Sequence, residues 1–286
     1  MKREKILIPV LIFAVLSTHI YSQRAKHNSA GQVELEAILK KCAEYCVKLG
    51  NSALDFVCIE EINEKINRSR EITPGWAHSY SDRKPIEKNK YIYDYQFIKK
   101  RQKMEETRIL LKENGKKKNE KNADLKTRAF IYQNVLFGPV ELIDKIIQQR
   151  YDYSIRNEEL IKGEEAVVIE AVPKPGNELG YLPYGKIWIK KADFSILKIE
   201  WNQRTVRSFE LVEKIAGLYN AEPKIVIFTE FEFEKKGIRF PSRHVIIEIY
   251  VGKDGSEFIR SETTVTYKDY KFFTVETEVK YERRPI

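Results

Sequence analysis

Histidines are the first residues of this chain to test for catalysis, because imidazole gains and loses protons near neutral pH. His27 lies near the start of the chain, His78 follows a Pro-Gly pair, and His244 stands beside Arg243 in an apolar stretch. None has a serine or cysteine at a spacing that predicts a nucleophile with its base. Nucleophile elbows, zinc-binding helices, glycine-rich phosphate loops and calcium loops are also absent from the sequence.

Three glutamates spaced two apart form the clearest carboxylate pattern: Glu230, Glu232 and Glu234. A glycosidase needs two carboxyl groups about 5 to 9 Å apart, which such a run could supply. However, Phe231 and Phe233 alternate with these glutamates, and that alternation is typical of a strand with one solvated face. We therefore predict no catalytic residue, no cofactor and no metal site, and a protein that is not an enzyme.

The N-terminal segment predicts the compartment. Three basic residues precede an apolar run at residues 6–16, and the small residue Ser22 follows as a cleavage site. This order is typical of a secretory signal peptide, and the run is shorter than the roughly 20 apolar residues that span a bilayer. We expect residues 1–22 to be removed, residues 23–32 to be flexible, and the product to be exported to the periplasm as a soluble protein.

Three cysteines lie close together near the start of the expected mature chain: Cys42, Cys46 and Cys58. Zinc would need a fourth ligand at a suitable spacing, and none follows. In an oxidising compartment one disulfide is expected instead, worth about 3 kcal/mol for a loop of this length. Cys46 lies nearer the turn at Asn51, so we predict a Cys46–Cys58 bond and a buried Cys42 thiol, with Cys42–Cys58 as the alternative.

One helix followed by many strands is predicted after the signal peptide. Apolar residues spaced three and four apart mark one face of a helix that ends at Gly50: Leu35, Leu39, Cys42, Cys46 and Leu49. About ten strand-like segments follow, with turns at Asn114-Gly115, Lys162-Gly163 and Lys236-Gly237. One strand is predicted at residues 128–136 and the last around Val275, and a second helix is predicted at residues 140–150. We expect residues 33–286 to form a single α+β domain that is mainly β. Its predicted form is an incomplete antiparallel β-barrel, or strongly curved sheet, with the helices in or over the concave face.

Aromatic residues are the candidate binding residues of this sheet. One predicted strand carries four aromatics on a single face, and other strands contribute more, giving the set Tyr91, Tyr93, Tyr95, Phe97, Trp188, Trp201, Phe231 and Phe233. If all of them face the concave side, they line a site for an acyl chain or a similar ligand. The alternative is an ordinary aromatic core. An open cavity of several hundred Å³ would favour a carrier, and a filled interior would favour an interaction scaffold.

The chain is basic, with a formal net charge of +9. Residues 1–22 carry a net +2, so their removal leaves +7 on the mature chain. An exported protein does not meet nucleic acid, so anionic lipid head groups and acidic glycans are the expected partners of this charge. The alternative is an ordinary solvated surface, because acidic residues are interspersed among the basic ones.

The order of signal peptide, helix and strand meander resembles that of periplasmic carriers of the outer-membrane lipoprotein-sorting system, the LolA/LolB-like proteins. The stretch at residues 185–200 resembles their paired strands around a charged turn, and coverage would extend over residues 33–281. The chain is also similar to a group of uncharacterised exported bacterial proteins with Tyr45-Cys46, Phe56-Val57-Cys58 and Phe137-Gly138-Pro139. The resemblance implies a protein that binds a lipid or acylated peptide, and it names no ligand-contacting residue and no protein partner. An envelope scaffold without bound lipid is the alternative.

Overall fold

The computed structural model describes residues 31–50, 55–69, 85–100, 103–133, 135–176, 182–207 and 209–273. The predicted signal peptide and a predicted last strand around Val275 lie outside these residues. Residues 31–50 are helical, so the N-terminal helix includes the last two positions of the segment that we expected to be flexible.

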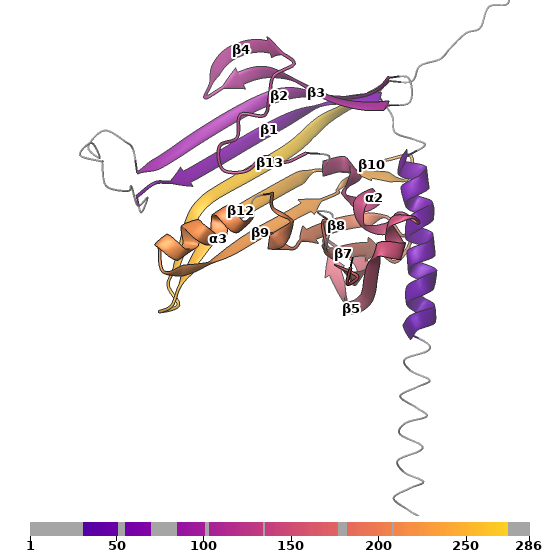
Figure 1. Ribbon diagram of the computed structural model, residues 1–286. Coiled ribbons are helices and arrows are strands. Elements are labelled where there is room, and N and C mark those ends of the chain that lie inside the picture. Colours follow the sequence, from indigo (N-terminus) through magenta and orange to yellow (C-terminus); the bar gives the residue numbers. More distant parts are fainter. Residues whose placement is uncertain are drawn as a thin grey trace, which may run out of the picture.

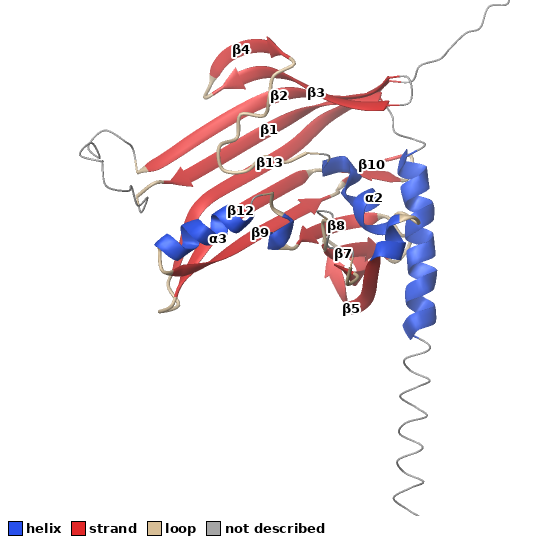
Figure 2. Ribbon diagram, viewed as in Figure 1, coloured by secondary structure: helices blue, strands red, loops and turns tan. Residues whose placement is uncertain are grey.

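Most of the described chain belongs to one large antiparallel sheet of eleven strands (Figures 1 and 2). The strands are β1 (Asp55–Asn67), β2 (Ile86–Lys100), β3 (Lys103–Glu113), β4 (Lys116–Lys121), β5 (Tyr151–Ile161), β6 (Glu164–Pro173), β7 (Gly185–Lys190), β8 (Ile196–Trp201), β9 (Ala221–Glu230), β12 (Arg243–Gly252) and β13 (Glu257–Phe273). Their order across the sheet is β4-β3-β2-β1-β13-β12-β9-β8-β7-β6-β5. The two edge strands, β4 and β5, do not pair with each other. The predicted fold class, a mainly β protein with a curved, unclosed sheet, is confirmed.

Two-residue turns set the register of three hairpins. Both residues have positive φ at Asn114-Gly115, at Lys162-Gly163 and at Lys236-Gly237. This conformation matches the twist of the strands that it joins, and glycine adopts it without steric penalty. The third turn joins β10 (Phe233–Lys235) to β11 (Ile238–Phe240), which form a separate two-stranded sheet.

The helices differ from the sequence prediction in two places. The segment predicted as one helix at residues 140–150 is divided into α2 (Gly138–Ile143) and a short 3-10 turn at Ile147–Arg150, because Asp144 is extended. A further helix, α3 (Phe209–Leu218), was not predicted, although Phe209, Val212 and Ala216 have the spacing of a buried helix face. α3 lies over β9 and β12 (Figure 2).

The segment between β4 and β5 connects the two opposite edges of the sheet, so it must cross one face. We call that face, which carries Tyr91, Tyr93 and Tyr95, the inner face, and we call residues 122–133 the strap. The strap has no regular secondary structure, so the strand predicted at residues 128–136 is wrong. The N-terminal helix and α2 cover the other end of the inner face, over β5 to β8 (Figure 1).

Candidate functional site

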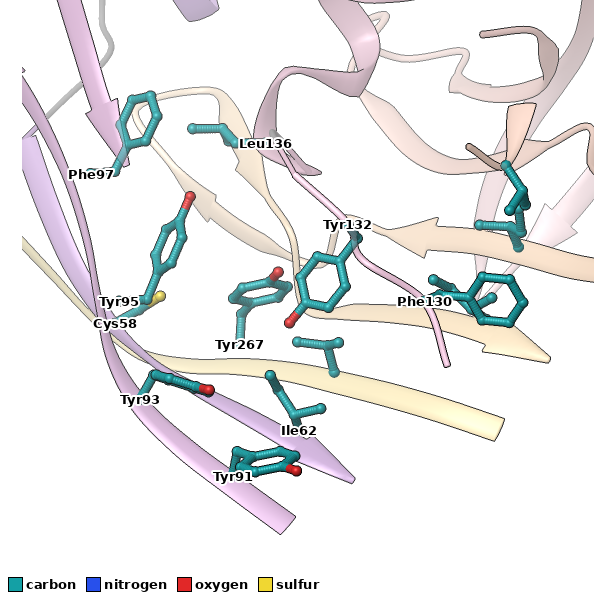
Figure 3. Close-up of a cluster of buried hydrophobic side chains, with 14 of the residues drawn as sticks. Cys58, Ile62, Tyr91, Tyr93, Tyr95, Phe97, Phe130, Tyr132, Leu136 and Tyr267 are labelled. Atoms are coloured by element: carbon teal, nitrogen blue, oxygen red, sulfur yellow. The ribbon is translucent and has the colours of Figure 1, made fainter. Parts of the chain in front are cut away.

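An aromatic layer on β2 forms the centre of the candidate site. Tyr91, Tyr93, Tyr95 and Phe97 alternate along the strand, and each side chain is at most 5% exposed. They belong to one cluster with Ile62 of β1, Tyr267 of β13 and the strap residues Phe130 and Tyr132 (Figure 3). The inner face at this end is therefore filled by side chains of the sheet and of the strap.

The other predicted cavity residues are distributed over several places. Trp201 is half-buried between the aromatic cluster and the cluster beneath the N-terminal helix, and Phe231 is buried in the second of these. Trp188 lies on the outer face, where its Nε1 donates to Glu159. Phe233 is 39% exposed on β10 and stacks on Tyr270. The assumption that all eight aromatics face one way is wrong for Trp188, because it alternates along β7 with Ile187 and Ile189, which pack in the cluster beneath the N-terminal helix.

A buried ion pair lies within the aromatic layer. Glu60 of β1 is fully buried, and Arg108 of β3 donates to it through Nε at 2.6 Å and through a second guanidinium nitrogen at 3.2 Å. The hydroxyls of Tyr132 and Tyr267 donate to the same carboxylate at 3.1 and 3.0 Å. Burial raises the pKa of both tyrosines well above the usual range, so both remain donors. Four donated hydrogen bonds thus stabilise one carboxylate among aromatic rings.

Glu64 lies four residues after Glu60 on the same face of β1 and binds the strap. It is buried and accepts hydrogen bonds from the backbone N–H groups of Arg128 and Ala129 at 2.8 and 2.9 Å. On β2, the hydroxyl of Tyr93 accepts from the backbone N–H of Lys126 at 3.2 Å. The strap is therefore held to the sheet by a small number of polar contacts in addition to its buried side chains.

Two polar atoms of the inner face have no hydrogen-bond partner among the described residues: Nε2 of His244 and Oγ1 of Thr263. The two side chains are diagonal neighbours, because His244 pairs with Val265, two positions from Thr263. The His244 ring also packs against Tyr132, with the ring centroids 5.3 Å apart. Burial lowers the pKa of His244 to about 4, so the imidazole is neutral at physiological pH. We call Glu60, Glu64, His244 and Thr263 the polar stripe.

Sequence reasoning missed the polar stripe because the segment after Ile59 reads as charged and therefore as solvated. The signal was present as a period of two that continues the strand: Phe56, Cys58, Glu60, Ile62, Glu64 and Ile66 are all buried. Reading this alternation through the glutamates would have placed both carboxylates on the inner face.

A small cavity lies away from the aromatic layer, at the ends of β8 and β9. Its volume is about 220 Å³, and its lining includes Lys162, Glu164, Glu230 and Arg239. These charged groups pair with one another, since Lys162 lies 3.6 Å from Glu230 and Arg239 lies 3.5 Å from Glu164. The charged side chains that line the cavity therefore neutralise one another.

The part of the chain that the structure describes has neither a cluster of metal ligands nor a membrane-spanning helix. No group of three or more His, Cys, Asp or Glu side chains is placed to hold a metal ion there. No helix in those residues is both long and apolar enough to cross a bilayer.

The predicted Cys46–Cys58 disulfide is absent from the structure, as is the alternative with Cys42: all three cysteines are buried free thiols. The reason is that Cys42 and Cys46 pack between the N-terminal helix and the strands β5 to β8, whereas Cys58 belongs to the aromatic cluster. Burial raises the pKa of Cys42 to about 12 and raises the pKa of Cys46 and Cys58 further still. The thiols are therefore protonated and weakly reactive.

Comparison with solved structures finds the predicted resemblance. A putative outer membrane lipoprotein-sorting protein domain from Vibrio parahaemolyticus is 12% identical, with a TM-score of 0.38, over 84% of this chain and 94% of that one. A DUF1329 family protein from Desulfovibrio piger is also 12% identical, with a TM-score of 0.37, over 84% and 95%. A LolA superfamily protein from Nitrosomonas europaea is 14% identical, with a TM-score of 0.31, over 84% and 94%. No family model and no curated protein matches the sequence.

Proposed function

We propose that this chain is an exported, non-enzymatic protein that binds a hydrophobic ligand, such as a lipid or an acylated peptide, on its inner face. The proposal places it in lipoprotein sorting or transport, the role for which the Vibrio parahaemolyticus domain is named. The observation that carries the proposal is the composition of the inner face. It combines an aromatic wall with a few buried polar groups, which is the usual composition of a small-molecule site.

The polar stripe supports a ligand that has a polar end. Buried polar atoms are nearly always hydrogen-bonded in native proteins, yet Nε2 of His244 and Oγ1 of Thr263 have no partner among the described residues. A ligand hydroxyl would donate to Nε2, and an ester or phosphate oxygen would accept from Oγ1. An acyl chain would then lie against Tyr91, Tyr93 and Tyr95.

Because strap side chains fill the inner face, binding requires the strap to move. Phe130 and Tyr132 would have to leave the aromatic cluster, and the ligand would replace their contacts with the sheet. The strap suits this role because it contains no helix or strand that would have to unfold. Its polar attachments to Glu60, Glu64 and Tyr93 would break on opening and re-form on ligand release.

Native mass spectrometry of protein purified from its own envelope tests this function. We expect a bound mass that dissociates as lipid or as acylated peptide, and uptake of added fatty-acyl ligand by stripped protein. A ligand-free spectrum together with no uptake would contradict the proposal.

A matched pair of variants locates the site. Tyr95→Leu removes an aromatic ring from the inner face, and Trp188→Leu removes one from the outer face. We expect ligand uptake to fall in Tyr95→Leu and to persist in Trp188→Leu, with circular dichroism confirming that both are folded. Equal uptake in the two variants would place the ligand elsewhere.

A second candidate function is an envelope scaffold that binds a protein partner and no lipid. The filled inner face favours it, because the aromatic cluster already contains side chains from the strap. Cross-linking in the envelope tests this alternative. A reproducible protein partner together with a lipid-free native spectrum would support the scaffold, and recovery of no partner would contradict it.

A further inference from the structure

The hairpin formed by β3 and β4 has two faces with different charge arrangements. On the inner side, Lys118 lies 3.2 Å from Glu113, and Lys126 of the strap lies 2.8 Å from Glu120. On the outer side, Lys112, Lys117 and Lys121 are all exposed, and no carboxylate among the described residues lies within ion-pair distance of them. The inner face of the hairpin is therefore neutralised, whereas the outer face near its turn carries three lysines without a paired carboxylate.

The strand register fixes which lysines share the outer face. Lys112 lies opposite Ile92 of β2, and Ile92 alternates with the inner-face residues Tyr91 and Tyr93. Lys117 lies directly opposite Lys112. Lys121 lies opposite Ile109, which pairs with the outer-face residue Asp94. The three lysines thus project from the same side of two adjacent strands.

Like charges directly opposite each other destabilise a pair of strands, because their Cβ atoms are only about 4.5–5.5 Å apart. The pair Lys112–Lys117 is of this kind, and a second such pair, Lys65–Lys88, follows on β1 and β2. Folding gains nothing from these contacts. An anionic surface that binds both members of each pair would remove the repulsion.

Acidic residues on the same face are few. Glu61 is already engaged, since it lies 2.5 Å from Lys90 and 2.8 Å from Lys268. Asp94 of β2 shares a row with Ile109 and Lys121. Glu105 lies further along β3, opposite Ile98, and Glu262 of β13 lies directly opposite Lys65. The hairpin end of the outer face, with Lys112, Lys117 and Lys121, has no acidic residue of its own.

We infer that this outer face, defined by Lys65, Lys88, Lys112, Lys117 and Lys121, is a docking surface for anionic phospholipid bilayers. The five ammonium groups are spread over four adjacent strands and do not converge on a pocket. This arrangement fits the many phosphates of a bilayer surface better than it fits a single small anion. Clusters of four to eight basic residues bind anionic membranes in this way. The surface is on the opposite side of the sheet from the proposed ligand site and does not depend on it.

Vesicle co-sedimentation with the mature chain tests the inference, using phosphatidylcholine vesicles with and without phosphatidylglycerol. We expect binding only to the anionic vesicles, weakening as salt is added. Each lysine near the surface contributes about fivefold, so the double variant Lys112→Gln/Lys117→Gln should lose affinity by about 25-fold. The matched control Lys116→Gln/Lys118→Gln removes the same charge from the inner side of the same hairpin and should retain most of the binding.

Thermal unfolding shows that a loss of binding is not a loss of folding. Lys112→Gln/Lys117→Gln relieves a repulsion, so its Tm should equal or exceed that of the parent. Equal losses in the two double variants would overturn the inference in favour of a net-charge effect. Binding to a sulfated oligosaccharide without binding to anionic vesicles would overturn it in favour of an acidic glycan.

Discussion

Glu60 and Arg108 form a buried ion pair across β2, with 2.6 Å between Oε2 and Nε, although they lie on strands that do not pair with each other. The Arg108 guanidinium also stacks over the ring of Tyr95, 5.0 Å from its centroid. Removal of one partner of a buried pair leaves the other charged and poorly compensated, whereas removal of both is often nearly neutral.

This difference predicts the result of a double-mutant cycle. Glu60→Leu should lower the free energy of unfolding by about 3–5 kcal/mol, because Arg108 stays charged in the core with only Glu106 beside it. Glu60→Leu/Arg108→Met should recover a large part of that loss. Urea denaturation measures both variants. If the double variant is as unstable as the single one, the pair contributes no coupling.

The hydroxyl of Tyr132 predicts how firmly the strap is held. Tyr132→Phe keeps the ring but deletes the hydrogen bond to Glu60, an interaction with a charged group worth about 1.5–3 kcal/mol. Backbone amides of the strap should therefore exchange with deuterium faster than in the parent. Tyr270→Phe is the control, because its hydroxyl donates to the carbonyl of Pro241, away from the strap. Unchanged exchange in Tyr132→Phe would show that packing alone holds the strap.

Glycine positions give a stability prediction with a built-in control. A Cβ at Gly185 would collide with the backbone carbonyl oxygen of Glu200, which cannot move without disrupting the pairing of β7 with β8. Gly185→Ala should therefore lower the Tm strongly. Gly217→Ala on α3 meets nothing within 4 Å and should stabilise by about 0.4–1 kcal/mol. Similar shifts in the two variants would contradict the close contact at Gly185.

Local sequence patterns predicted the features that depend on neighbouring residues. The period of two placed Tyr91, Tyr93, Tyr95 and Phe97 together on one face, and the Asn-Gly and Lys-Gly turns marked their hairpins. The strap could not be predicted in this way. Its conformation depends on contacts with Glu60 and Glu64, which lie more than 60 residues earlier in the sequence. The spacing of apolar residues within a segment gives no information on contacts with such distant residues.

The cysteines show the same limitation. Helical spacing correctly predicted that Cys42 and Cys46 are buried on one face of the helix. Whether either can pair with Cys58 depends on which strands of the sheet the helix packs against. The helix packs over β5 to β8, and Cys58 faces the aromatic layer. Sequence separation alone contains no information on that choice.

Free thiols predict that a reductant has no effect on stability. The Tm should be the same with and without dithiothreitol, and iodoacetamide should label the folded protein slowly because the buried thiols are protonated. Mass spectrometry after denaturation should then find all three cysteines labelled. A Tm that falls on reduction would show that the protein forms a disulfide after all.

His244 predicts a pH dependence of stability. Its pKa is about 4 in the folded protein because of burial, against about 6.5 when exposed, so the unfolded chain binds the proton more tightly. Between pH 6.5 and about 4 the unfolded state therefore carries more bound protons, and the free energy of unfolding decreases as the pH falls through this window. The carboxylates add their own dependence at the lower end, since ion pairs with Lys268 and Lys90 hold the pKa of Glu61 at about 2.

His244→Gln separates the two contributions. Glutamine retains a polar group near Thr229, whose hydroxyl bonds to Nδ1 of His244 at 2.9 Å, but it does not titrate. We expect the variant to lose the slope between pH 6.5 and 5 while keeping the steeper decline below pH 4. Chemical denaturation at a series of pH values measures this. An unchanged slope above pH 5 would mean that His244 is protonated in the folded state, and hence that its Nε2 has found an acceptor on the inner face.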